Sequence, residues 1–147
     1  MLARLRKAVD EKDSGFTLIE LLVVMIIIGI LAAIAIPVFL NQRKSAFDSA
    51  IKSDLRTVSV EVEGYFTDVQ SYPTGITGAV DAYDLTGVGP LETSKGVVLV
   101  YTINTAGTAY CISGNIPNKS SVNWLYRSNA GGLQPKVAGA TCPTGAF

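Results

Sequence analysis

The sequence has no histidine and only two cysteines among its 147 residues. Histidine is the commonest general base and metal ligand in proteins, and two cysteines alone do not make a zinc site. The twelve basic and twelve acidic residues cancel to a formal net charge of zero, unlike a typical nucleic-acid-binding protein. We therefore expect no catalytic site, no metal or cofactor, no nucleic-acid partner, and a chain that is not an enzyme.

Charge is also missing from one long stretch, since residues 21–40 contain no Asp, Glu, Lys or Arg. A helix rises about 1.5 Å per residue, so these residues span about 30 Å, the thickness of a bilayer's hydrocarbon core. Arg4, Arg6 and Lys7 precede the run, which favours a cytoplasmic N-terminus and an external remainder. The two cysteines suit an oxidising exterior.

Two interpretations of the apolar run compete. The segment Ala33-Ile34-Ala35 matches the small-x-small cleavage pattern of a secretory signal. However, the run is longer than the usual apolar region of about 7–15 residues, contains the carboxylate Glu20, and continues to Leu40. We therefore favour a helix that stays in the mature protein.

The next thirty residues carry a helical stripe. Apolar residues recur there at steps of three and four, which predicts an amphipathic helix: Phe47, Ile51, Leu55, Val58, Val62, Tyr65 and Val69. Joined to the apolar run, this gives one helix from about Phe16 to about Val69, roughly 80 Å long. Its first half is apolar all round and must be buried in lipid or among copies of itself. Gly29 and Pro37 are its weak points.

The remainder predicts β structure. Three segments rich in β-branched and aromatic residues predict strands: Val97–Ile103, Ala109–Ile116 and Asn123–Asn129. The first two are joined by a short loop that contains Gly107. Residues 73–96 are expected to be a surface loop with at most one short element, and the tail after Lys136 is expected to be irregular. The predicted fold class is α+β, with the long N-terminal helix packed on a small antiparallel sheet.

Three smaller features involve only a few residues each. Cys111 and Cys142 are expected to form a disulfide that ties the tail to the sheet, contributing about 3–4 kcal/mol by the chain-entropy estimate. Asp81 and Asp84 have the oxygen ligands that calcium prefers, although a solvated loop is the favoured interpretation. Asn118-Lys119-Ser120 is a glycosylation sequon, a weak signal by itself.

The run Gly15-Phe16-Thr17-Leu18-Ile19-Glu20 follows a short basic leader and precedes the apolar stretch. It resembles the class III signal of type IV pilins and their pseudopilin relatives, and the likeness covers about Ser14 to Ser45. The resemblance implies that a prepilin peptidase cuts after Gly15 and methylates the new amine of Phe16. It also implies that Glu20 is the assembly glutamate, that Pro37 is the helix-breaking proline, and that Gly29 lies in a segment that loosens in filaments.

Glu20 has no cationic side chain near it, because residues 16–42 contain no lysine or arginine. Its only available cation is the α-amine that cleavage would create at Phe16, with an ordinary pKa of about 7.7–8.0. Before cleavage that nitrogen belongs to a neutral amide. We therefore expect only processed subunits to satisfy Glu20, within one chain or between neighbours.

The expected organisation is a leader at residues 1–15, a transmembrane or filament-core helix at 16–40, and an external head at 41–147. The resemblance implies a structural subunit, the major pilin of a type IV pilus, assembled by the pilus machinery from a membrane pool into a homopolymeric surface fibre. One alternative is a major pseudopilin of a type II secretion or competence system. Another is a membrane-anchored binding domain that never polymerises.

Overall fold

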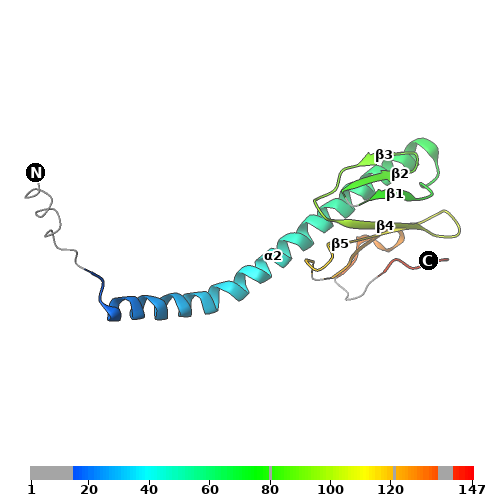
Figure 1. Ribbon diagram of the computed structural model, residues 1–147. Coiled ribbons are helices and arrows are strands. Elements are labelled where there is room, and N and C mark those ends of the chain that lie inside the picture. Colours follow the sequence, from blue (N-terminus) through cyan, green and yellow to red (C-terminus); the bar gives the residue numbers. More distant parts are fainter. Residues whose placement is uncertain (1–14, 80, 121, 136–140) are drawn as a thin grey trace, which may run out of the picture. The chain divides into compact units, whose positions relative to one another are not determined.

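A computed structural model describes residues 15–79, 81–120, 122–135 and 141–147. One long helix, α2, is followed by two small antiparallel sheets, which confirms the predicted α+β class (Figure 1). The chain divides into two compact units, Met1–Leu40 and Asn41–Phe147, and each is described by itself. The expected leader falls on residues 1–14 and Gly15, so nearly all of it lies outside the described residues.

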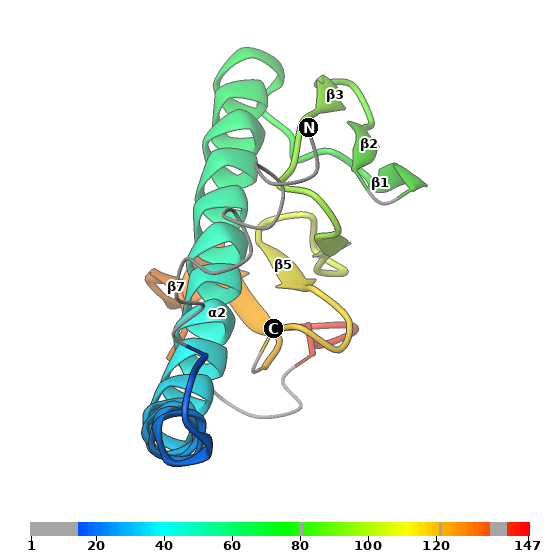
Figure 2. The ribbon, with the colours of Figure 1, turned by 60° about the vertical axis from the view of Figure 1, so that its left-hand side comes forward.

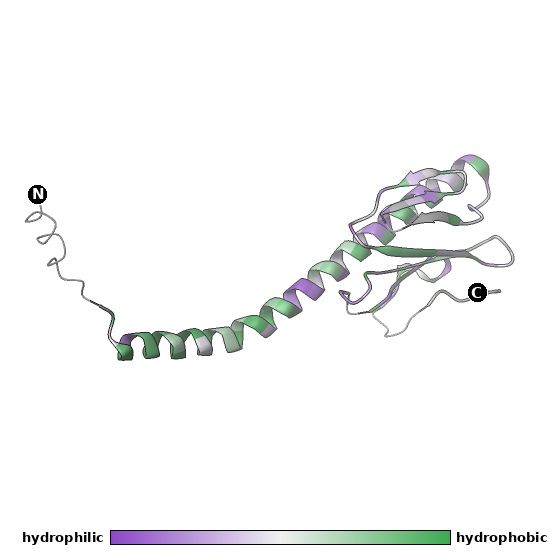
Figure 3. Ribbon diagram, viewed as in Figure 1, coloured by the Kyte–Doolittle hydropathy of each residue, from purple (hydrophilic) through white to green (hydrophobic). Residues whose placement is uncertain are grey.

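Helix α2 spans Leu18–Val69, close to the predicted bounds. It contains both the apolar run and the amphipathic stripe, as the hydropathy colouring in Figure 3 shows. The helix is continuous through Gly29 and Pro37 in this isolated subunit. A break at these two residues therefore remains a prediction for the assembled fibre.

The second unit is built on the amphipathic part of α2. Four residues of the predicted stripe are at most 1 % exposed: Ile51, Leu55, Val58 and Val62. They belong to one hydrophobic cluster with residues of both sheets, and Figures 1 and 2 show the strands lying along this part of the helix. The spacing of three and four residues explains this, because it gathers the apolar side chains on one face.

The larger sheet has the strand order β4-β5-β6-β7, with every neighbouring pair antiparallel. The strands are β4 (Val98–Ile103), β5 (Tyr110–Asn115), β6 (Trp124–Arg127) and β7 (Gly132–Leu133). The first three confirm the three predicted strands to within two residues at each end. β7 was not predicted, since two residues after the short helix η1 (Ser128–Ala130) carry no periodic pattern.

The prediction for residues 73–96 was wrong. Instead of a loop with one short element, they form a three-stranded sheet of β1 (Ile76–Ala79), β2 (Ala82–Leu85) and β3 (Gly89–Leu91). Such short, glycine-containing strands have weak local signals. Their stability comes from tertiary contacts, because Tyr83, Leu85 and Leu91 are 0–6 % exposed and join the main core.

A tyrosine and two carboxylates connect the small sheet to the rest of the second unit. The Tyr83 hydroxyl accepts a hydrogen bond from the Leu99 N–H at 2.9 Å. Asp54 of α2, only 8 % exposed, accepts hydrogen bonds from the N–H and hydroxyl of Ser94 at 2.8 and 3.0 Å. Asp81 accepts a hydrogen bond from the Gly96 N–H. The connection between β3 and β4 is therefore fixed by one carboxylate from α2 and one from the turn between β1 and β2.

The predicted disulfide between Cys111 and Cys142 is confirmed, with the two Cα atoms 5.6 Å apart. It fixes the C-terminal segment, whose described part, residues 141–147, contains no strand or helix. The Thr105 N–H donates to the Gly145 carbonyl at 3.2 Å, and the Arg127 guanidinium carbon lies 5.6 Å from the centre of the Phe147 ring. The tail is thus attached at both ends to the larger sheet.

Candidate functional site

The apolar part of α2 is uncovered in the isolated subunit. Phe16, Leu18 and Met25 are 82, 80 and 73 % exposed, and the other large apolar side chains up to Leu40 are at least 46 % exposed. Among the described residues, α2 is the one helix long and apolar enough to cross a membrane. Because exposed apolar surface is unfavourable in water, this segment requires lipid or other apolar helices around it.

The start of this segment forms a capping box. Thr17 precedes the first helical residue, Leu18, and the Glu20 carboxylate accepts hydrogen bonds from the Thr17 N–H at 2.8 Å and the Thr17 hydroxyl at 2.7 Å. The Thr17 hydroxyl oxygen in turn accepts one from the Glu20 N–H at 3.3 Å. This reciprocal arrangement satisfies donors that the first helical turn leaves unpaired. Sequence reasoning missed it, although Thr-x-x-Glu before an apolar run is its signature.

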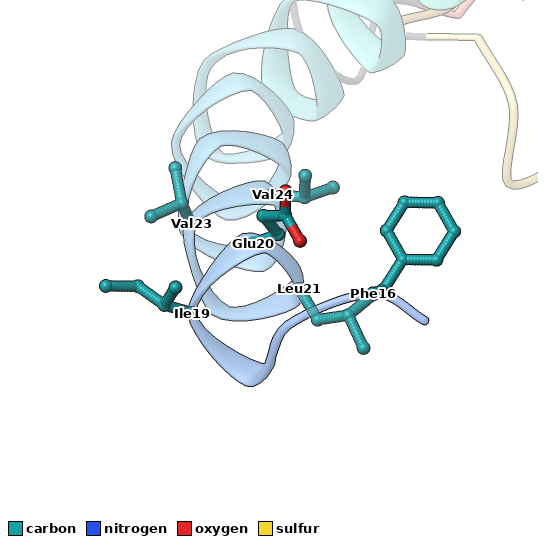
Figure 4. Close-up of a pocket in the computed structure, with 6 residues that line it drawn as sticks. All are labelled: Phe16, Ile19, Glu20, Leu21, Val23 and Val24. Atoms are coloured by element: carbon teal, nitrogen blue, oxygen red, sulfur yellow. The ribbon is translucent and has the colours of Figure 1, made fainter. Parts of the chain in front are cut away.

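Among the described residues that line a shallow hollow beside the helix start, Glu20 has the only polar side chain. Figure 4 shows it with the apolar residues that share the lining: Phe16, Ile19, Leu21, Val23 and Val24. Both hydrogen bonds from Thr17 to the carboxylate use the same oxygen, Oε2. A carboxylate among apolar side chains is a suitable partner for one cation from outside the helix.

The residues predicted for processing are accessible. Gly15 and Phe16 are exposed, and no atom lies within 4 Å of the position that a Cβ atom at Gly15 would take. Neither cleavage after Gly15 nor methylation at Phe16 is visible in an unprocessed chain, so both remain predictions. The same holds for the role of Glu20 in assembly.

The second unit contains an aromatic cluster that the sequence did not predict. The Tyr110 ring lies 5.0 Å from Tyr72, 5.7 Å from Tyr101 and 6.1 Å from Tyr126, measured between ring centres. The Tyr110 hydroxyl donates to the Glu63 carboxylate at 3.0 Å. These contacts tie β4, β5 and β6 to the last turns of α2.

Burial raises the pKa of Tyr110 well above its ordinary value, and the hydrogen bond to Glu63 raises it further. Burial also raises the pKa of Tyr101 and, with the nearby Glu63 carboxylate, that of Tyr72. These phenols stay protonated at neutral pH. The Tyr72 and Tyr110 hydroxyls donate to the Glu63 carboxylate at 3.4 and 3.0 Å, whereas the buried Tyr101 hydroxyl has no hydrogen-bond partner among the described residues.

Metal binding finds no support among the described residues, where no three His, Cys, Asp or Glu side chains gather into a possible metal site. At the loop considered for calcium, Asp81 uses its carboxylate to fix the Gly96 N–H. Asn118 of the sequon is exposed and has a positive φ of 61° in a turn. The start of α2, where the only carboxylate of the apolar segment lies, is therefore the candidate functional site in the described part of the chain.

Similarity to known proteins also includes the helix start. Residues 11–36 match the model of the prokaryotic N-terminal methylation motif. The chain is 35 % identical over 98 residues to the type IV wide pilus major component PilA4 of Thermus thermophilus, a match covering 67 % of this chain and 70 % of the relative. It is 30 % identical over 136 residues to the fimbrial protein EcpC of Eikenella corrodens, covering 82 % and 86 %.

A further relative belongs to a secretion system. The type II secretion system core protein G of Escherichia coli is 28 % identical over 105 residues, covering 69 % of this chain and 72 % of the relative. Other curated relatives of both kinds are matched over less than half of their own length, 45 % and 29 % in two cases. The N-terminal motif, the helix-on-sheet fold and the extent of the longer matches lead to one conclusion: the chain belongs to the family of type IV pilins and type II secretion pseudopilins.

Proposed function

We propose that this pilin-like fibre subunit is the major pilin of a type IV pilus. The observation that carries the proposal is the extent of the two pilus matches, which reach 98 and 136 residues at 35 and 30 % identity. Matches that cover 67 and 82 % of this chain extend beyond the apolar helix into the head. The relatives are structural subunits, and we propose the same non-enzymatic role here.

Processing comes first in the proposed sequence of events. A prepilin peptidase removes residues 1–15 by cutting after Gly15 and methylates the new amine of Phe16. The match to the methylation motif and the exposure of both residues support this step. Cleavage replaces a neutral peptide nitrogen by a basic amine, which is cationic at neutral pH.

Glu20 links processing to assembly. Before cleavage, its carboxylate is held by Thr17 through Oε2. After cleavage, the amine of Phe16 in a neighbouring subunit supplies the cation that no side chain of residues 16–42 provides. In an apolar fibre core an unpaired carboxylate is strongly unfavourable, so we propose that this pairing selects processed subunits.

The proposed subunit occupies two locations in turn. Its apolar helix, residues 16–40, first spans the cytoplasmic membrane with the head outside. The assembly machinery then extracts it into a homopolymeric fibre, in which apolar helices bury one another and the heads face the solvent. Exposed apolar side chains along the whole segment support both states. Gly29 and Pro37 are proposed to loosen during this transfer, since proline lacks a helical hydrogen bond.

Fibre examination tests the proposal directly. Surface material is sheared from the source cells, imaged by electron microscopy, and analysed by mass spectrometry for this subunit. Long fibres composed of the chain, beginning at a methylated Phe16, are the expected result. An anchored, non-polymerising protein would instead remain entirely with the cell membrane, and an N-terminus at Met1 would exclude the processing step.

The second candidate is a major pseudopilin, favoured by the match that covers 72 % of a type II secretion protein G. A pseudopilin would leave no long surface fibres at natural expression levels. Deleting it would instead stop the export of folded proteins, whereas deleting a pilin would remove surface fibres and leave that export intact. The two measurements, made on the same deletion strain, separate the candidates.

A further inference from the structure

A hollow lies between α2 and β7 in the second unit. Its lining includes Arg56, which is exposed, and Val60, whose side chain is 69 % exposed. Tyr126 also lines it, and a Cβ atom at Gly132 would lie only 3.2 Å from the Tyr126 ring, so the ring rests on this glycine. We name it the basic hollow, because Arg56 is the one charged residue among the described residues of its lining.

A second hollow lies between α2 and the turn that joins β2 to β3. Its lining includes two exposed acids, Glu61 and Asp68, together with Tyr65 and Val88. Gly87 allows Tyr65 to lie against this turn, because its φ is 89° and a Cβ atom there would lie 2.8 Å from the tyrosine ring. We name it the acidic hollow, since no lysine or arginine belongs to its described lining.

The two hollows face different directions around the same helix. Val60 and Tyr65, which line one hollow each, are five positions apart, a turn of about 140° around the helix axis. Figure 2 accordingly shows β7 and β3 on opposite sides of α2. One copy of the chain therefore cannot bring its own two hollows together, and each hollow is available to a different neighbour.

The charges that line the hollows have no partner within the described part of the chain. The side chains of Arg56, Glu61 and Asp68 make no hydrogen bond or ion pair with any described residue. Each hollow also has apolar surface beside its charge, from Val60 in the basic hollow and Val88 in the acidic one. Opposite charges set beside apolar surface are the complementarity by which protein surfaces recognise one another.

We propose that the basic hollow of one head binds the acidic hollow of a second copy, so that Arg56 pairs with Glu61 and Asp68 across the contact. Because the two surfaces differ, the contact is heterologous, and each copy binds one neighbour on each flank. Arg56 precedes the acids by five and twelve positions, about 8–18 Å of helix. With α2 parallel in both copies, each copy is displaced along the helix direction, which builds an open helical array rather than a closed ring. This inference rests on the proposed fibre and names a contact between its heads.

Carbodiimide cross-linking of sheared fibres tests the contact without removing its charges. The reagent joins an ammonium to a carboxylate that it touches, so Arg56→Lys makes the proposed pair reactive. Mass spectrometry should find position 56 of one copy joined to Glu61 or Asp68 of another copy. Adding Glu61→Gln and Asp68→Asn should remove this product. Fibres of Arg56→Lys in which position 56 is joined to neither acid of another copy would overturn the inference.

A charge exchange tests whether the pairing stabilises the fibre. Arg56→Glu should lower the yield of sheared fibres roughly fivefold, because like charges replace an ion pair, and adding Asp68→Arg should restore the yield. The matched control is Lys95→Glu, at an exposed lysine outside both hollows, which should keep the wild-type yield. Equal Tm values of the variants in detergent show that the heads remain folded. A yield of Arg56→Glu equal to that of Lys95→Glu would overturn the inference.

Wild-type fibres separate this inference from the proposed function. If the sheared fraction of the source cells contains no fibre of this chain, the fibre role is refuted, and the contact between heads is refuted with it. If fibres form and position 56 stays unlinked in the Arg56→Lys variant, only the docking of the two hollows is refuted.

Discussion

Gly114 of β5 determines how closely the helix approaches the larger sheet. A Cβ atom at this position would lie 2.9 Å from Ile51 Cγ2, 3.1 Å from Leu99 Cδ2 and 3.4 Å from Leu55 Cδ2. Ordinary carbon contacts are about 3.5–4.0 Å, so the side chains of Ile51 and Leu99 would both have to move. All three neighbours belong to the buried core and are 0–4 % exposed, which leaves them little room to move.

The prediction compares Gly114→Ala with Gly64→Ala. Gly64 is an exposed interior residue of α2 with no atom within 4 Å of its Cβ position, so alanine there should stabilise the head by about 0.5–1 kcal/mol. The same chain-entropy gain applies at Gly114, but overpacking costs about 1–3 kcal/mol. The difference between the two variants therefore isolates the steric cost, about 1–3 kcal/mol in favour of Gly64→Ala.

Thermal unfolding of the full chain in detergent, followed by near-ultraviolet circular dichroism, measures this difference. One kcal/mol corresponds to roughly 4–8 °C in Tm for a domain of this size, so Gly114→Ala should melt at least about 4 °C below Gly64→Ala. Equal Tm values for the two variants would refute the close approach of β5 to α2.

Three further outcomes are expected. Replacing Cys111 and Cys142 by serine should lower the free energy of unfolding by about 3–4 kcal/mol, because their 31-residue separation closes a large loop; alkylation of the unreduced wild type, if seen by mass spectrometry, would contradict the bond. Glu20→Gln should be processed normally but yield few fibres, which immunoblots of membrane and sheared fractions would show; a wild-type fibre yield would remove the charge-pair explanation. The head should keep its full stability below about pH 10, the ordinary tyrosine pKa, and lose it as pH rises further, because the raised pKa values of Tyr101 and Tyr110 favour the protonated folded form. Tyr110→Phe should lessen this alkaline loss, and the tyrosinate absorbance that this variant removes, as one of six tyrosines, should appear in the wild type only together with unfolding; its appearance well below the unfolding transition would contradict the burial of Tyr110.

The helix and the principal strands could be predicted because their signals are local. The stripe through Ile51, Leu55, Val58 and Val62 has a period that only a helix can gather on one face, and the segments forming β4 and β5 are rich in β-branched and aromatic residues. The capping box of Thr17 and Glu20 was equally local and could have been found from its spacing.

The three-stranded sheet could not be predicted in the same way. Its strands are three or four residues long and contain Gly78 and Gly89, so their intrinsic preference for β structure is weak. They form because Tyr83 bonds to the backbone of β4 and Asp54 fixes Ser94, forty residues away in sequence. Contacts over such separations depend on the complete fold and leave no periodic trace.

The sequence by itself determined the long helix, its division into an apolar and an amphipathic part, the processing motif, and the cysteine pair. Each depends on residue type and spacing along one segment, where hydrophobic periodicity and charge act directly. Only the tertiary structure decided the second sheet, the tyrosine cluster around Tyr110, and the meeting of Lys119 with Phe47. These features join segments far apart in the chain, and their geometry is set by packing against α2, which no single segment specifies.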